Sequence, residues 1–349
     1  MAKIRIFSTD TDTDDGVISV IGKSGKTEHT TLQQIPIGNA PRGSVKFTGA
    51  GRGFVSNTSQ NTISELDPVA LEEVRRIEVG HGPRGLGVVP GDRYLLASNS
   101  GSDTLSIVDL ELNVELRQIP IGRDPRHMAI SADGQRAFVC VWGEGVLAEV
   151  DIFPLQDDEP EAVRILGAVE LGRTAHPYSA TMDPSGERIW VANTQATYAS
   201  VVDRASGAVT QIDLGAIGGR AVAFSPDQRF ALISVETESK VAVVDRDTLQ
   251  VTRFIPVGPG PRGLTVDVLD ETLYVTNFAR ESVSALPNHP NYGPNTLTAV
   301  DLTSAPLDEP TGEFTYQPIE VGYGPCSVAV LDVAALPTSA ERRRTTARG

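Results

Sequence analysis

A glycine that closes a short apolar run recurs along the whole chain, and this repeat limits the possible folds more than any other feature. The seven anchor glycines are Gly38, Gly80, Gly122, Gly172, Gly215, Gly258 and Gly322. The intervals from Gly38 to Gly80 and from Gly80 to Gly122 are 42 residues each, the length of one four-stranded propeller blade. Seven anchors therefore predict seven blades.

The residues within each unit follow a common order. A Pro-Arg turn after the anchor, such as Pro83-Arg84, leads into a first strand such as Met128-Ala129-Ile130. A tight turn such as Ala132-Asp133-Gly134 follows, and the second strand ends in Asn in four units, as in Trp190-Val191-Ala192-Asn193. β-Branched residues between turn residues are typical of short strands.

The seventh unit is split between the two ends of the chain. Residues 322–330 supply only a first strand, and residues 3–7, 16–21 and 31–37 supply the three that are missing. A blade shared by both ends closes the ring without an exposed edge. We therefore predict an all-β fold: a seven-bladed β-propeller with four antiparallel strands per blade, closed by N-terminal strands and a C-terminal innermost strand.

We expect one domain over residues 1–337 and a disordered polar tail over residues 338–349. The expected blades are residues 38–79, 80–121, 122–171, 172–214, 215–257, 258–321, and 322–335 together with 1–37.

Composition limits the partners of the protein. The net charge is −15, which disfavours nucleic acid and anionic membranes as partners. The two cysteines, Cys140 and Cys326, fall in different expected blades, so we expect reduced thiols. The N-terminal residues read as a strand and not as a signal peptide, so we expect a cytoplasmic protein, or a secreted one if a leader has been removed.

Residues 274–277 read Tyr-Val-Thr-Asn, and the repeat as a whole resembles the YVTN family of β-propellers. The resemblance covers nearly the whole chain and implies the propeller fold. Similar propellers occur as lactone-hydrolysing enzymes, cofactor-enzyme subunits, surface-layer proteins and nucleic-acid binders, so the resemblance does not select a function.

Basic residues recur in the turn that leads into the first strand. Five units carry Arg there, and the other two carry Tyr178 and Cys326; the arginines are Arg42, Arg84, Arg126, Arg220 and Arg262. These turns belong to the face around the mouth of the central channel, where a rigid scaffold displays functional loops. Two Arg charges about 10 Å apart repel each other by roughly 1.7 kcal/mol at an effective dielectric of 20. The ring is either an anion-binding site or a structural feature in which nearby acids and carbonyls pair with each Arg.

Departures from the repeat supply further candidates on the same face. Three of the five histidines, His81, His127 and His176, lie in successive turns and are candidates for a metal site, a general base or simple hydrogen bonding. Their unequal distances from the anchor glycine disfavour a metal site. We expect no bound metal, and we expect no cofactor. The other departures are Trp142, Glu144, Glu236 and Tyr323. Residues 280–294 form an insertion that is either a cap over the channel mouth or an inert surface loop.

We therefore predict a site for a small anionic or polar molecule at the channel mouth, with hydrolysis, lyase or cyclisation chemistry if the protein is an enzyme. In this hypothesis the ligand is bound by the five arginines, Trp142, Glu144, Tyr323 and Cys326, and acid–base chemistry falls to His176, Tyr178, His127 and Glu236. The alternative is a non-catalytic scaffold that binds a protein partner.

Overall fold

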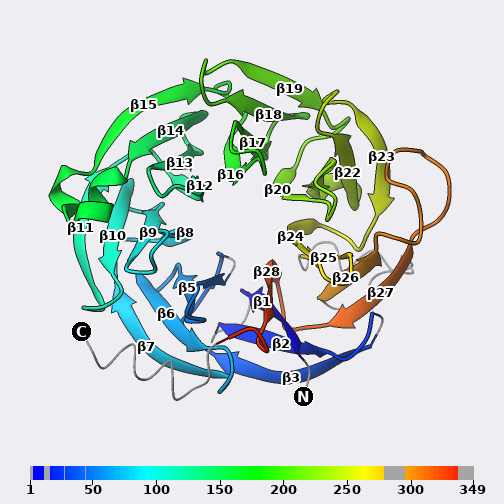
Figure 1. Cartoon of the computed structure of the whole chain (residues 1–349), viewed down its shortest axis with the longest axis horizontal. Coiled ribbons are helices and arrows are strands. Elements are labelled where there is room, and N and C mark those ends of the chain that lie inside the picture. The colour runs from blue at the N-terminus through cyan, green and yellow to red at the C-terminus, as the bar shows by residue number, and fades with distance from the viewer. Residues whose placement is uncertain (1–2, 12–15, 27, 44, 279–294, 337–349) are drawn as a thin grey trace.

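Seven four-stranded antiparallel sheets stand in a ring around a central channel in the computed structural model of the chain (Figure 1). The structure describes residues 3–11, 16–26, 28–43, 45–278 and 295–336. The predicted seven-bladed β-propeller is confirmed. The expected tail and the 280–294 insertion lie outside the described residues.

Each blade runs from an inner strand at the channel to an outer strand at the rim. Blade 1 is β4 (Lys46–Phe47), β5 (Gly53–Asn57), β6 (Thr62–Asp67) and β7 (Glu72–Glu78). Blade 2 is β8 (Pro83–Val88), β9 (Tyr94–Asn99), β10 (Thr104–Asp109) and β11 (Val114–Pro120). Blade 3 is β12 (Pro125–Ile130), β13 (Arg136–Val141), β14 (Val146–Asp151) and β15 (Arg164–Glu170).

The next three blades repeat this order. Blade 4 is β16 (Pro177–Met182), β17 (Arg188–Asn193), β18 (Tyr198–Asp203) and β19 (Val209–Asp213). Blade 5 is β20 (Gly219–Phe224), β21 (Phe230–Val235), β22 (Lys240–Asp245) and β23 (Val251–Pro256). Blade 6 is β24 (Pro261–Asp267), β25 (Thr272–Asn277), β26 (Thr296–Asp301) and β27 (Thr315–Glu320).

Blade 7 joins the two ends of the chain. Its strands are β28 (Pro325–Asp332), β1 (Ile4–Asp10), β2 (Val17–Lys23) and β3 (His29–Pro36), in that order from the channel outward. Phe7 of β1 pairs with Ala329 on one side and with Val20 on the other. The N-terminal strand is therefore an interior strand of its sheet.

Short 3-10 helices are the only helices in the described chain: η1 (Phe153–Asp157) and η2 (Pro160–Ala162) between β14 and β15, and η3 (Glu236–Glu238) after β21. None of the helices described is long and apolar enough to cross a membrane.

In three blades a contact inside the blade explains the anchor glycine. A Cβ on Gly38 would lie 2.4 Å from Cγ of Asn57, the last residue of β5, closer than real Cβ atoms come. The Asn57 amide packs there because its Nδ2 donates to the hydroxyl of Ser64 on β6 at 2.8 Å. The same overlap would occur at Gly80, against Asn99, and at Gly258, against Asn277. The Gly and the Asn of the repeat thus form one structural unit.

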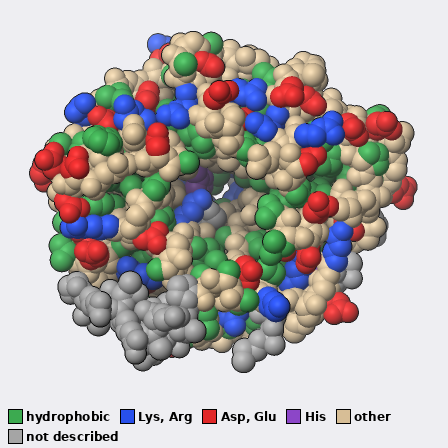
Figure 2. All heavy atoms as spheres, in the orientation of Figure 1, with side chains coloured by type: hydrophobic (Ala, Val, Ile, Leu, Met, Phe, Trp, Pro, Cys, Tyr) green, Lys and Arg blue, Asp and Glu red, His purple; other side chains and the backbone are tan. Residues whose placement is uncertain are grey.

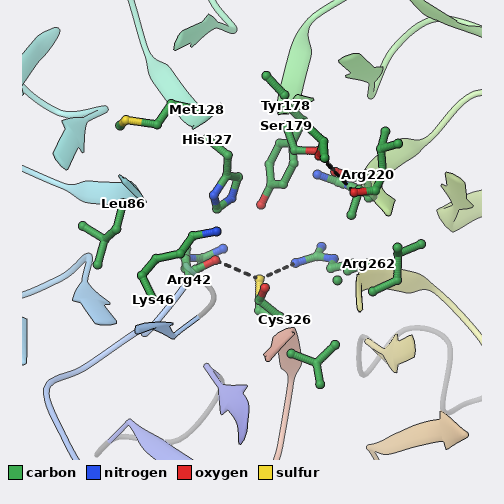
Figure 3. A pocket seen from close by; sticks show the side chains of 18 residues that line it. Arg42, Lys46, Leu86, His127, Met128, Tyr178, Ser179, Arg220, Arg262 and Cys326 are labelled. Carbon is green, nitrogen blue, oxygen red and sulfur yellow. Dashed lines mark hydrogen bonds between the residues drawn. The ribbon is translucent and has the colours of Figure 1, made fainter. Parts of the chain in front are cut away.

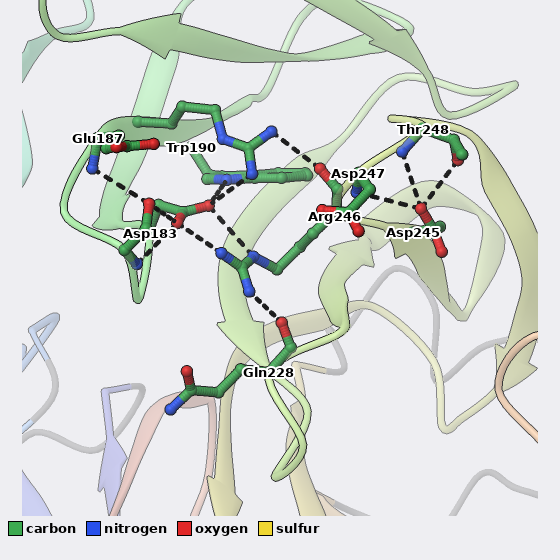
Figure 4. A network of polar contacts seen from close by, with 10 residues as sticks. Asp183, Glu187, Trp190, Gln228, Asp245, Arg246, Asp247 and Thr248 are labelled. Atoms are coloured by element: carbon green, nitrogen blue, oxygen red, sulfur yellow. Dashed lines mark hydrogen bonds and ion pairs between the residues drawn. The ribbon is translucent and has the colours of Figure 1, made fainter.

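Apolar side chains fill the spaces between blades, and a few buried ion pairs join blades as well. In Figure 4, Asp183 at the end of β16 faces Arg246, which follows β22 in blade 5. Arg246 Nη2 lies 2.7 Å from Asp183 Oδ1, and the indole of Trp190 donates to Oδ2 at 3.0 Å. Burial alone would raise the pKa of Asp183, but these hydrogen bonds outweigh it and lower the pKa to about 2. The carboxylate therefore stays ionised and joins blades 4 and 5.

Candidate functional site

The turn residues that were predicted to face the channel meet at its axis. A cavity of about 120 Å³ lies there, and Figure 2 shows a central hollow with basic and histidine atoms inside it. Five of the seven ring residues line this cavity: Arg42, Tyr178, Arg220, Arg262 and Cys326. The remaining two, Arg84 and Arg126, are not part of the lining, but they interact electrostatically with His127, which is.

Close contact between inner strands accounts for the Gly that follows Arg in three of the turns. A Cβ on Gly85 would lie 2.5 Å from the carbonyl oxygen of Arg126 in the next blade. That carbonyl also accepts a hydrogen bond from the hydroxyl of Ser98. In blade 3 the position after Arg is His127 instead of Gly. The break in the Pro-Arg-Gly repeat therefore puts an imidazole at the axis.

One side of the site is neutralised by carboxylates. Glu236, just after β21, accepts from Nε of Arg220 at 2.6 Å and from Nε of Arg262 at 3.0 Å. Burial would raise the pKa of Glu236, but the two guanidinium groups outweigh burial and lower it. Arg126 pairs with Asp124 at 2.6 Å. The two carboxylates thus account for three of the arginines.

Tyr178 lies between two of these cations. The guanidinium carbon of Arg220 is 4.8 Å from the centre of the Tyr178 ring, and that of Arg126 is 5.8 Å from it. Cation–π contacts of this kind hold the ring in place. Its hydroxyl points into the cavity in Figure 3.

The other side of the site carries three cations that form no ion pair within the described part of the chain. Among the residues that the structure describes, no carboxylate forms an ion pair with Arg42, Lys46 or Arg84. Arg84 only donates from Nε to the hydroxyl of Ser100, at 2.8 Å. Burial, followed by repulsion from Arg126 and Arg42, lowers the pKa of Arg84 to about 10, and burial lowers the pKa of Lys46. These three groups create a local positive field in an acidic protein.

His127 stands among these cations. Burial first, and then repulsion from Lys46, Arg84, Arg126 and Arg220, lowers its pKa to about 3. The imidazole is therefore neutral near pH 7, with one nitrogen able to donate and one able to accept a hydrogen bond. Its ring centre lies 5.0 Å from that of Tyr178.

Other predicted residues lie outside the cavity wall. His176 stacks on Trp142 with ring centres 4.0 Å apart, and its Nδ1 donates to the Trp142 carbonyl at 2.9 Å. Trp142 in turn lies under Arg126, 5.1 Å from ring centre to guanidinium carbon. Glu144 is exposed and accepts from a backbone N–H at 2.9 Å, while Tyr323 is 62% exposed. These residues surround or support the site without lining it.

Sequence reasoning missed Lys46 and Ser179 in the cavity wall. Ser179 is the residue after Tyr178, at the same position as His127 in blade 3, and its hydroxyl donates to the Arg220 carbonyl at 2.8 Å. Lys46 lies four residues after Arg42, on β4. Its position in an inner strand was the sequence signal that could have placed it at the cavity. No group of three His, Cys, Asp or Glu able to hold a metal ion occurs in the described parts of the chain.

Comparison with known proteins supports the fold. The family model described as YNCE-like beta-propeller matches residues 31–154, which supports a β-propeller repeat protein; the YVTN resemblance stays a prediction. No curated protein sequence matches the chain.

Several solved structures share the architecture at low sequence identity. A putative 6-phosphogluconolactonase from Bacteroides fragilis superposes with a TM-score of 0.76 at 15% identity, covering 95% of this chain and 98% of that one. The periplasmic gluconolactonase of Pseudomonas aeruginosa gives 0.75 at 16% identity, covering 95% and 99%. Hydrazine synthase of Kuenenia stuttgartiensis gives 0.65 at 18% identity, covering 84% and 96%. At these identities the likeness concerns the fold alone.

Proposed function

We propose that the protein binds a small anionic molecule in the axial cavity. The observation that carries this proposal concerns Arg42 and Lys46 in the cavity wall, with Arg84 close by: no carboxylate of the described residues forms an ion pair with any of the three. Keeping unpaired charges partly buried is unfavourable. A bound anion offsets that cost, and an Arg fork and a Lys point charge are common partners for carboxylate and phosphate groups.

The cavity also favours a small ligand over a protein partner. A docking face for a protein is broad and filled, whereas these cations converge inside a hollow. A volume of about 120 Å³ is below the roughly 300 Å³ at which drug-sized pockets begin. The ligand, or the part of it that is enclosed, is therefore small.

Calorimetry at low salt tests the proposal with a panel of small carboxylates, phosphates and sulfate. We expect at least one of these anions to bind, and expect the variant Arg42→Gln/Lys46→Gln to weaken that binding at least tenfold. Arg173→Gln is the matched control, because Arg173 is exposed and outside the cavity wall. If no anion binds, or if the double variant binds as tightly as the wild type, the proposal fails.

A second candidate function is hydrolysis of a lactone that carries a negative charge. It is favoured by the convergence of the Tyr178 hydroxyl and the neutral His127 imidazole on a wall that includes Arg262. Water would add to the lactone carbonyl, the ring C–O bond would break, and the proton released by water would end on the ring oxygen to give a hydroxy acid. The cations would stabilise the oxyanion that forms in between.

The names of the two lactonase structures suggest the assay. Ring opening of gluconolactone and of its 6-phosphate is followed as acid release above the spontaneous rate. We expect Tyr178→Phe and Arg262→Gln to slow turnover, and Arg173→Gln to leave it unchanged. His127, with a pKa of about 3, is suited to hydrogen bonding more than to general-base catalysis at neutral pH. Absence of turnover above background with both lactones would leave the protein an anion binder.

A further inference from the structure

We infer that the anion in this cavity is a compact dianion of the phosphoryl type, bound on the side of Arg42, Lys46 and Arg84. This inference rests on the proposed function and narrows its ligand class. It follows from the uneven distribution of charge around the axis, from the donor-rich wall and from the size of the cavity.

Charge is the first argument. Four cations line the cavity and two more act on His127 in its wall, and only two carboxylates, Asp124 and Glu236, pair with any of these six in the described chain. The six are Arg42, Lys46, Arg84, Arg126, Arg220 and Arg262. A ligand with a single negative charge would leave most of the excess positive charge around the cavity uncompensated. A dianion offsets more of this positive charge, and repulsion from Arg42 is one of the causes that lower the pKa of Arg84.

Location is the second argument. Glu236 occupies the guanidinium groups of Arg220 and Arg262, and Asp124 occupies Arg126. Blades 1 and 2 supply the cations that remain. In Figure 3 Lys46 and Arg42 reach into the cavity from the side opposite Arg220. The anionic group is therefore bound off the axis, toward blades 1 and 2.

The chemistry of the wall is the third argument. Guanidinium and ammonium groups only donate hydrogen bonds, and both Lys46 and Arg42 are in the wall. The Tyr178 hydroxyl adds another donor that points inward. A fully ionised phosphate or sulfate group only accepts hydrogen bonds, so it matches this wall better than a hydroxyl-rich neutral group does. A volume of about 120 Å³ suits one such group, with the rest of a larger ligand lying along the channel.

Calorimetry with four probes tests the inference: sulfate, inorganic phosphate, malonate and formate, at constant ionic strength. We expect sulfate to bind at least tenfold more tightly than formate. Phosphate should bind more tightly at about pH 8 than at about pH 5, because it loses its second proton in between. Sulfate keeps its charge over this range and reports any effect of titrating the protein itself.

Variants locate the site. Lys46→Gln and Arg84→Gln should each weaken sulfate about tenfold and formate much less, while Arg173→Gln should change neither. Circular dichroism checks that each variant is folded, and Lys46→Met replaces Lys46→Gln if the amide disturbs the wall.

The outcomes separate this inference from the proposed function. Equal affinity for formate and sulfate overturns the dianion and leaves anion binding intact. Tighter binding of malonate than of sulfate overturns the phosphoryl class in favour of a dicarboxylate. Absence of binding by all four probes removes the proposed function as well.

Discussion

Glu236 accepts a hydrogen bond from Nε of Arg262 at 3.0 Å, and this contact crosses the boundary between blades 5 and 6. The second carboxylate oxygen of Glu236 accepts from Arg220, in the same blade as Glu236. Glu236 follows Val235, which stands where four other blades end their second strand with Asn. Glu236, one residue beyond this position, bridges Arg220 and Arg262 at the channel.

Glu236→Gln should destabilise the fold and strengthen anion binding. The amide keeps the shape but leaves Arg220 and Arg262 without a negative charge, at a cost of about 2–3 kcal/mol. Urea unfolding with and without sulfate measures both effects, because a bound anion should recover part of the lost stability. A variant as stable as the wild type, with unchanged response to sulfate, would show that the clamp is not what holds these cations.

The fold was predictable because its signals are local. The anchor glycine recurs once in each unit, so the number of anchors predicted the number of blades, and in blade 2 Gly80 is required by its contact with Asn99. The ring of arginines was predictable for the same reason, because each occupies the same place in its unit.

The pairing of charges was not predictable from spacing. Whether an Arg is neutralised depends on acids that arrive from the neighbouring blade, as Glu236 does at Arg262. His176 and His127 were both predicted to supply acid–base chemistry, but His176 has a left-handed backbone with φ of 51° and turns onto Trp142. No other blade has a lysine at the position of Lys46, so the repeat pattern did not mark it. Only its place in the inner strand β4 put it near the axis.

Asp10 should make stability fall as pH rises. It takes the Asn position in blade 7, where its carboxyl accepts from Ser8, Ser19 and the N–H of Gly322. Burial raises its pKa to about 7, despite those hydrogen bonds, against about 3.9 in the unfolded chain. Between these two values the folded state holds more protons than the unfolded state, so stability decreases as pH increases through this range.

Asp10→Asn tests this dependence, since it restores the residue of the other blades and removes the titration. Urea unfolding from about pH 4 to about pH 8 should show that the free energy of unfolding of the variant increases relative to that of the wild type as pH rises. Parallel pH profiles for the two proteins would contradict the raised pKa.

Gly85→Ala should destabilise the contact between blades 2 and 3. The added methyl group would meet the Arg126 carbonyl at 2.5 Å and Cα of His127 at 2.6 Å, so an inner strand has to move. We expect a loss of about 1–3 kcal/mol and weaker anion binding, because His127 shifts with the strand. Gly167→Ala is the control: a Cβ there has nothing within 4 Å, and its effect should be within about 0.5 kcal/mol. Equal melting temperatures for both variants would show that the inner strands are less tightly packed than the distances indicate.

His127 should report on occupancy of the site through its titration. Its pKa of about 3 results from burial and from the cations around it, so removing a cation or adding an anion raises it. Lys46→Gln and saturating sulfate should each move the NMR titration of His127 toward about 6.5. Below about pH 6.5 His127 is protonated in the unfolded chain but not in the folded protein, so acid lowers the stability of the ligand-free protein. Bound sulfate should reduce this loss of stability, because it raises the pKa of His127 in the folded state. Arg173→Gln should leave the titration where it is. If His127 titrates near 6.5 in the wild type, the cations do not lower its pKa. The argument that unpaired positive charge creates an anion site would then fail.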